Sequence, residues 1–106
     1  MYFAPAYTYC PDNATTVVST ESVLIYGIQI SVYADGGRTP ILNFQSGDGS
    51  KTYFSIRISA QAVPSTIGVY KAINIPWIAD QGLRVVVPDH GSDFTSATIF
   101  HSSGGA

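Results

Sequence analysis

The residues best suited to catalysis or metal binding are few in this chain, and they lie far apart. The two histidines, His90 and His101, are eleven residues apart, and Cys10 is the single cysteine. A zinc site needs three or four converging ligands, usually including a closely spaced pair. Because these three residues offer no such pair, we expect no metal site.

Acid–base and nucleophilic chemistry are equally weakly indicated. A serine-hydrolase triad could be written with His90 and Asp89 or Asp93, but the chain has no nucleophile elbow. Glu21 is the single glutamate, and the aspartates lie mostly in turn segments, where their side chains bond to nearby backbone. No phosphate-binding glycine motif occurs. We therefore predict a protein that is not an enzyme and takes no cofactor.

The single tryptophan is the residue with the clearest binding potential. Exposed Trp and Tyr rings stack on sugar faces, so Trp77 with Tyr53, Tyr33 or Tyr70 could form a small glycan-binding platform. The alternative is that Trp77 fills the core where the strand ends at Pro76. Both interpretations remain open at the level of the sequence.

Composition limits the partners of this 106-residue chain. Charged residues make up 11% of it, with 5 basic and 7 acidic residues and a net charge of −2, against about 25% in typical soluble domains. The five cations are scattered, which disfavours nucleic acid. A nearly neutral surface offers little repulsion against association, so protein partners are favoured.

Compartment signals point to the cytoplasm of the producing cell. A lone cysteine excludes an internal disulfide and suits a reducing environment. The first residues have neither the basic start nor the apolar run of a secretory signal. No apolar stretch approaches the roughly 20 residues of a membrane helix, so we expect no membrane association.

Short runs of β-branched and aromatic residues dominate between Thr15 and Ser102, and each run stops at Gly, Pro, Asp or Ser. They predict seven or eight short strands and no helix, in an all-β, single antiparallel β-sandwich or jelly-roll-like domain. The predicted strands cover residues 15–19, 23–34, 41–45, 52–59, 66–75, 83–87 and 95–101, with 76–78 closing the fifth. In the long strand, alternation places Tyr26, Ile28, Ile30 and Val32 on one face.

Residues 1–13 differ from the rest of the chain. They contain Pro5, Pro11 and four aromatic residues without regular spacing, which predicts an extended, irregular arm. Because aromatic rings need a surface to cover them, the arm should lie on its own domain or on a neighbouring subunit. We take its interface residues to be Tyr2, Phe3, Tyr7 and Tyr9. The predicted division is an arm over 1–13, a sandwich over 14–101 and a flexible tail over 102–106.

Three segments resemble strands of small β-sandwich virion proteins from tailed bacteriophages. The stretch from Ile73 to Val87 has a Pro-bounded strand followed by Gly-Leu and a Val-rich strand, and residues 97–100 resemble their short final strand. The run from Val23 to Ile28 is similar to their first long strand. The likeness covers roughly residues 15–101 and consists of strand patterns.

This resemblance implies a structural role in a virion. The expected function is that of a capsid decoration, or cement, protein. Such a protein forms a homo-oligomer, commonly a trimer, and clamps onto the lattice of the major capsid protein through its N-terminal arm and its sandwich surface. The expected location is the virion, at the capsid surface. A tail, fibre or knob component is the alternative within this class, and a glycan-binding module is the alternative outside it.

Overall fold

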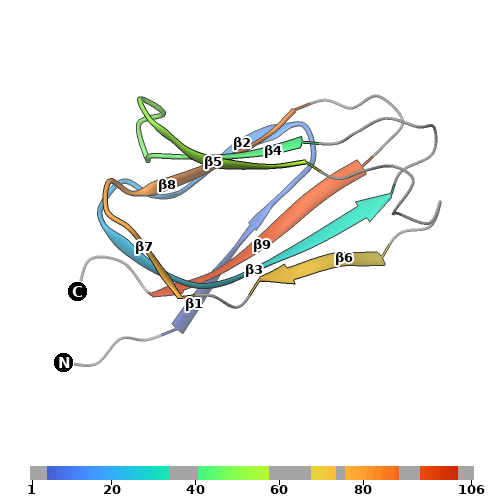
Figure 1. The fold of residues 1–106 in the computed structure, drawn as a ribbon, viewed down its shortest axis with the longest axis horizontal. Coiled ribbons are helices and arrows are strands. Elements are labelled where there is room, and N and C mark those ends of the chain that lie inside the picture. The colour runs from blue at the N-terminus through green and yellow to red at the C-terminus, as the bar shows by residue number, and fades with distance from the viewer. Residues whose placement is uncertain (1–4, 34–40, 58–67, 74–75, 89–93, 103–106) are drawn as a thin grey trace.

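The computed structural model describes residues 5–33, 41–57, 68–73, 76–88 and 94–102, and these residues form nine strands without a helix (Figure 1). The strands are β1 (Pro5–Cys10), β2 (Ala14–Ser19), β3 (Val23–Tyr33), β4 (Ile41–Gln45), β5 (Thr52–Arg57), β6 (Gly68–Ile73), β7 (Trp77–Ala79), β8 (Leu83–Val87) and β9 (Phe94–Ser102). No helix in these residues is long and apolar enough to cross a membrane.

The strands form two antiparallel sheets that face each other. The first sheet has the order β1-β9-β3-β6, with β7 also paired to β3, and the second has the order β2-β8-β4-β5. The chain is thus a long hairpin with β4 and β5 at its tip, followed outwards by the pairs β3–β6, β2–β8 and β1–β9. Wrapping such a hairpin into two sheets gives the jelly roll, so the predicted all-β sandwich class is confirmed.

The N-terminal segment corrects one expectation. Residues predicted to form an irregular arm instead contribute β1, which pairs with β9 without interruption from Pro5 to Cys10. Pro5 is the first residue of the strand, a position where a missing N–H is tolerated, and Pro11 follows the last. The two prolines therefore bound a strand, and this part of the segment belongs to the sandwich.

A β-bulge in β3 corrects a second expectation. Ile25 pairs with His101 and Gly27 with Phe100, so Tyr26 is an extra residue in β3 without an opposite partner. The bulge changes the phase of the alternation: Ile25 and Ile28 both point into the core, whereas Tyr26 is exposed. Strict alternation had grouped Tyr26 with Ile28, and that assignment was wrong.

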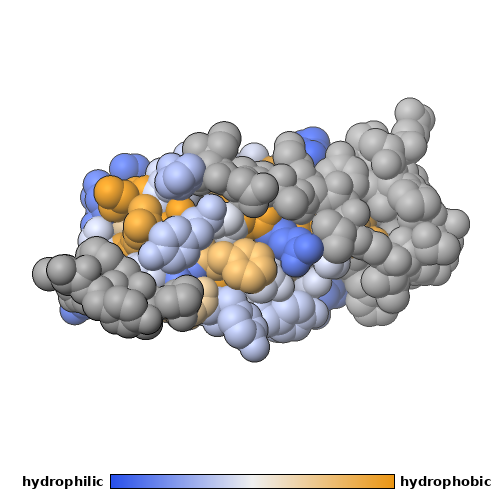
Figure 2. Space-filling model, turned by 90° about the horizontal axis from the view of Figure 1, so that it is seen from below, coloured by the Kyte–Doolittle hydropathy of each residue, from blue (hydrophilic) through white to orange (hydrophobic). Residues whose placement is uncertain are grey.

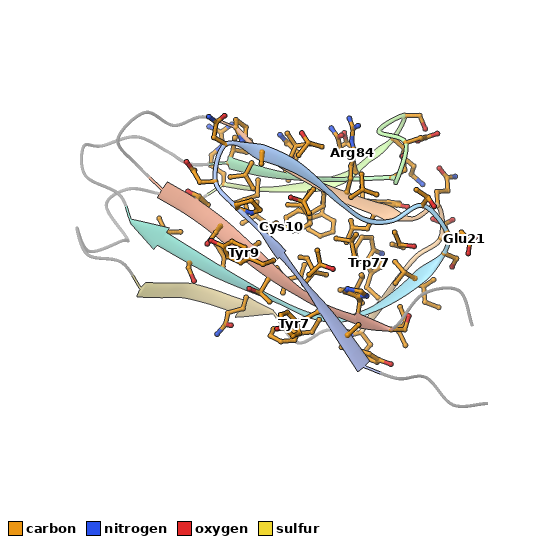
Figure 3. The ribbon with its side chains drawn as sticks, turned by 180° about the vertical axis from the view of Figure 1, so that it is seen from behind. Tyr7, Tyr9, Cys10, Glu21, Trp77 and Arg84 are labelled. Carbon is orange, nitrogen blue, oxygen red and sulfur yellow. The ribbon has the colours of Figure 1, made fainter. Side chains whose placement is uncertain are left out.

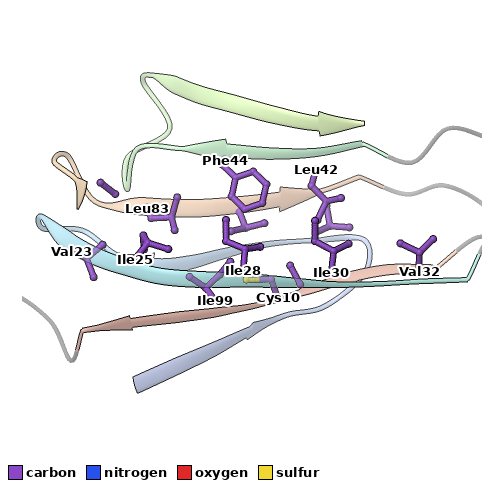
Figure 4. Close-up of a cluster of buried hydrophobic side chains, with 14 residues drawn as sticks. Cys10, Val23, Ile25, Ile28, Ile30, Val32, Leu42, Phe44, Leu83 and Ile99 are labelled. Carbon is purple, nitrogen blue, oxygen red and sulfur yellow. The ribbon is translucent and has the colours of Figure 1, made fainter. Parts of the chain in front are cut away.

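The core lies between the sheets and consists of aliphatic residues around one phenylalanine (Figure 4). Phe44 is completely buried and stacks on Phe54, with their ring centroids 4.8 Å apart. The thiol of Cys10 also lies in this core, and desolvation raises its pKa to about 11, against a smaller opposing effect of the hydrogen bond with Thr16. Cys10 therefore acts as a small apolar residue that anchors β1.

Three turns lock together at one end of the sandwich. Gly47 and Gly82 pack against the backbone of Ser19 and Thr20, where an added Cβ at Gly82 would lie 2.4 Å from the Ser19 carbonyl oxygen. Gly82 also has a φ of 81°, which favours glycine. The Tyr53 hydroxyl donates to the Gly82 carbonyl at 2.8 Å and accepts from the Gln81 N–H at 3.0 Å. These contacts fix the β7–β8 turn to β5.

The β4–β5 loop is built around the carboxylate of Asp48. The Oδ1 atom of Asp48 accepts hydrogen bonds from the Ser50 N–H at 2.9 Å, the Ser50 hydroxyl at 2.8 Å and the Ser46 hydroxyl at 2.9 Å. These bonds, the backbone one first, lower the pKa of Asp48 to about 2. Because they stabilise the charged form, the carboxylate is part of the folded loop.

We expect an Asp48→Asn variant to lose stability chiefly above about pH 4, the ordinary titration range of aspartate. The folded-state pKa is below the unfolded one, so the charged group stabilises the fold at neutral pH, and this contribution is lost as the pH falls towards 2. Urea unfolding at several pH values checks this. The stability difference between the wild type and the variant should narrow between pH 4 and 2, and a difference that does not change with pH would contradict the assignment.

Candidate protein-interaction face

Aromatic side chains gather on the outer surface of the first sheet, where β1 lies beside β9. Tyr7 and Tyr9 alternate with the inward-facing Thr8 and Cys10, so both rings point away from the core. Tyr7 is 73% exposed and Tyr9 is 57% exposed. Tyr7 is directly opposite Phe100 of β9, which is 40% exposed. The three rings thus occupy adjacent positions on one surface.

The same surface continues across β3 to β7. Phe100 is paired on its other side with Gly27, and the β3 bulge exposes Tyr26 next to this glycine. Ile78, in the strand at the far side of β3, is 61% exposed. We call the group formed by Tyr7, Tyr9, Tyr26, Ile78 and Phe100 the aromatic face. Figure 2 looks onto this side of the molecule, where apolar groups and pale aromatic rings lie together.

The aromatic face has no charge among the side chains described on its sheet. Its polar neighbours are the uncharged Gln29, Ser31, Ser96 and Thr98. The cations whose side chains are described, Lys51, Arg57 and Arg84, lie on β5, β8 and the β4–β5 loop, which belong to the second sheet. Among the described side chains, the cations therefore lie with the second sheet, and the exposed rings lie with the first.

The outer surface of the second sheet is polar. The Arg84 guanidinium donates from Nε to the Gln45 side-chain oxygen at 2.8 Å and lies against Gly49. The Ser55 hydroxyl donates to Asn43 Oδ1 at 2.6 Å. In the described part of this sheet, Val17 of β2 is the one large apolar side chain that is mainly open to solvent, and it is 50% exposed. The described outer surface of the second sheet therefore carries paired polar groups, and it has no apolar cluster comparable to the aromatic face.

Hydrogen bonds hold β1 and its tyrosines in place. Inside the sandwich, the Nδ1 atom of His101 donates to the Ser102 carbonyl at 2.6 Å, so in the neutral ring Nε2 accepts from the Thr8 hydroxyl at 2.9 Å. After β1, the carboxylate of Asp12 accepts from the Thr95 N–H at 3.1 Å. Removing residues 1–13 would therefore take away a core residue and these bonds, so the segment is not a separable arm.

The residues predicted for the interface fall into two groups. Tyr7 and Tyr9 lie together on the aromatic face, whereas Tyr2 and Phe3 lie outside the described residues. The sequence analysis missed Phe100, Tyr26 and Ile78. Alternation along residues 95–101 did indicate Phe100, because it places Phe100 on the opposite face of the strand from the apolar Ile99. The exposure of Tyr26 and the position of Ile78 depend on a bulge and on the pairing of β7 with β3.

The candidate metal ligands are not brought together. His101 is buried near Thr8, whereas Cys10 pairs with Ala97 further along β9. His90 lies outside the described residues. Within the part of the chain that the structure describes, no group of three or more His, Cys, Asp or Glu residues could hold a metal ion.

Trp77 lies among the aromatic side chains that close one margin of the sandwich (Figure 3). Its ring makes edge-to-face contacts with Tyr53 and Phe54, at centroid distances of 5.0 and 5.3 Å. The Tyr53 hydroxyl is already bonded to the β7–β8 turn, and Lys51 Nζ lies 5.3 Å from the centre of the Tyr53 ring. These contacts give Trp77 and Tyr53, two of the predicted glycan-stacking residues, a role in packing.

We expect the fluorescence of Trp77, the single tryptophan, to be largely shielded from acrylamide in the folded protein and to become accessible on unfolding. Its half-buried ring packs against the core, so quencher reaches only part of it. Stern–Volmer constants in buffer and in denaturing urea check this. Equal constants in both conditions would show an exposed indole and restore the case for sugar stacking.

The fold and this surface define a jelly-roll sandwich with an uncharged aromatic face on one sheet and a polar, cationic surface on the other. A scan against protein-family models and a search of the curated proteins found no match to this chain.

Proposed function

We propose that this protein is a non-enzymatic structural component of a bacteriophage virion, a decoration protein that attaches to the lattice of the major capsid protein through its aromatic face. The observation that supports this most strongly is the gathering of exposed rings on one sheet surface, among described side chains that carry no charge. Large exposed apolar patches on soluble domains mark contacts with other macromolecules.

The size of the aromatic face suits one side of a protein interface. A fully buried aromatic side chain covers about 150–250 Å². Because the four rings of the aromatic face are on average about half exposed, roughly 400 Å² of their surface is left for a partner to cover. A standard interface buries about 800 Å² on each partner. The rings and their polar neighbours therefore supply the apolar centre of such an interface, with a polar rim around it.

Attachment through a preformed strand costs less conformational entropy than attachment through a flexible arm. Ordering a flexible segment costs about 1–2 kcal/mol for each residue that is fixed. Tyr7 and Tyr9 project from β1, which is already paired to β9 over its whole length. Binding then costs mainly side-chain freedom, about 0.5–1.5 kcal/mol for each immobilised side chain. Several copies on one repeated lattice would add the gain of multivalency.

A tail or fibre component would use the same surface, and the number of bound copies distinguishes the two locations. The experiment is to add purified protein to particles that lack it and to collect the particles by centrifugation. We expect saturable binding at a fixed number of copies for each capsid subunit. Saturation at a few copies per particle would instead indicate the tail, and absence from the pellet at all concentrations would overturn the proposal.

A further inference from the structure

The jelly roll leaves four strands at the edges of its sheets, and these edges differ in how they are protected. β1 and β6 are the edges of the first sheet, and β2 and β5 are the edges of the second. An exposed edge presents unpaired N–H and C=O groups to other chains, and proteins usually blunt it with a bulge, a charge or a short strand.

Three of the four edges carry such devices. β2, β5 and β6 each contain a bulge, because Val18, Tyr53 and Tyr70 have no opposite residue in the neighbouring strand. β5 also contains Arg57 and β6 contains Lys71. β7, which pairs beside β6, is three residues long. Each of these edges is thereby made unsuitable for regular pairing with another chain.

β1 carries none of these protections over its described residues except Pro5 at its beginning. It is six residues long, has no charged side chain, and pairs with β9 in unbroken register. Every second residue of an antiparallel edge strand directs its N–H and C=O away from its partner. In Figure 3, β1 crosses in front of β9, and it is the outermost described strand of its sheet.

We propose that the free edge of β1 pairs with β1 of a second copy of this chain, in antiparallel orientation about a twofold axis. A twofold contact brings identical strands together, so any charge near its centre would face a like charge. β1 has no charge to repel its own copy. The contact would join the two first sheets into one continuous sheet.

The alternation of side chains limits the register of this contact. Opposed residues in a sheet must point to the same side, and in β1 the odd-numbered Tyr7 and Tyr9 point outwards while Thr8 and Cys10 point inwards. A twofold axis at Thr8 satisfies this and places Tyr7 of each copy opposite Tyr9 of the other. Cross-strand aromatic pairs of this kind stabilise sheets.

The dimer would double the aromatic face. Because a twofold axis perpendicular to the sheet keeps both outer surfaces on one side, the two aromatic faces would form one continuous apolar surface. This arrangement differs from the trimer implied by the resemblance, since a twofold contact closes with two copies. The inference does not rest on the virion proposal, because β9 is the one described strand that pairs with β1, whatever the aromatic face binds.

The test compares the mass in solution of the full chain with that of charge variants, by sedimentation equilibrium over a range of concentrations. We expect the wild type to have twice the chain mass and a Tyr7→Asp/Tyr9→Asp variant to have the mass of one chain. A Tyr7→Lys/Tyr9→Lys variant should likewise be monomeric. An equimolar mixture of the two variants should regain the doubled mass, because Asp and Lys would then face each other. This recovery also shows that the variants are folded.

Phe100→Asp is the matched control, because Phe100 lies on the same surface but one strand inside the edge. Edge pairing predicts that this variant stays dimeric, whereas stacking of two aromatic faces predicts a monomer. A monomeric or trimeric wild type, a monomeric Phe100→Asp variant, or a mixture that fails to associate would each overturn the inference. A monomeric wild type that still sediments with particles would leave the virion proposal standing.

Discussion

Replacing Tyr7 and Phe100 together with serine is expected to weaken attachment to particles by about a hundredfold for each binding site. The two rings are directly opposed on β1 and β9 and form the centre of the aromatic face. Complete burial of an aromatic side chain contributes about 1.5–3 kcal/mol, and partial exposure before binding reduces this gain. Two rings then contribute roughly 2–4 kcal/mol, and each 1.4 kcal/mol is a factor of ten.

The folded domain should tolerate this change. Both side chains point away from the core, so the expected loss of stability is that of one cross-strand pair, about 0.2–1 kcal/mol. Binding is measured by co-sedimentation with particles at increasing protein concentration. Val17→Ser is the control, since it removes an exposed apolar side chain from the second sheet. If the control weakens binding as much as the double variant, attachment does not depend on the aromatic face.

Truncating Phe44 to alanine should cost about 3–5 kcal/mol of the free energy of unfolding, the largest effect on stability that we expect from one side chain. Phe44 is completely buried between the sheets and stacks on Phe54, so its removal leaves a cavity that the surrounding strands cannot close. A domain of ordinary stability has about 5–15 kcal/mol in total. The variant would therefore be partly unfolded or close to it.

Urea denaturation followed by Trp77 emission measures this loss, because Trp77 packs against Phe54 and reports on the same region. Phe44→Leu is the matched variant, for which we expect a cost below about 2 kcal/mol because most of the volume is kept. A loss under 1 kcal/mol for Phe44→Ala would show that the two sheets are not packed around this ring.

The strands bounded by strong local signals could be predicted from the sequence. Pro40 precedes β4, and Gly82 and Pro88 flank β8, so both strands have the predicted bounds. The strand predicted over residues 66–75 is β6 in the structure, and β7 is a separate strand after it. Local alternation and turn residues carry this information, because they act within a few positions of the chain.

The aromatic face could be predicted only in part, because it depends on contacts between distant residues. Tyr7 is opposite Phe100, and neither residue's local pattern shows this pairing. The prolines near β1 suggested an irregular arm, although they only bound the strand. Tyr26 joins the face through a bulge, which no periodic pattern reveals. The grouping of rings thus follows from the topology, and the sequence indicated only Tyr7 and Tyr9.

The most direct test of the proposed function is to image purified virus particles with and without this protein by electron microscopy. Our account predicts density at regular positions between capsid subunits, with the first sheet of the jelly roll turned towards the shell and Tyr7 and Phe100 at the contact. Density confined to the tail would place the protein in a tail or fibre. Particles of identical composition and density in both preparations would contradict a structural role in the virion.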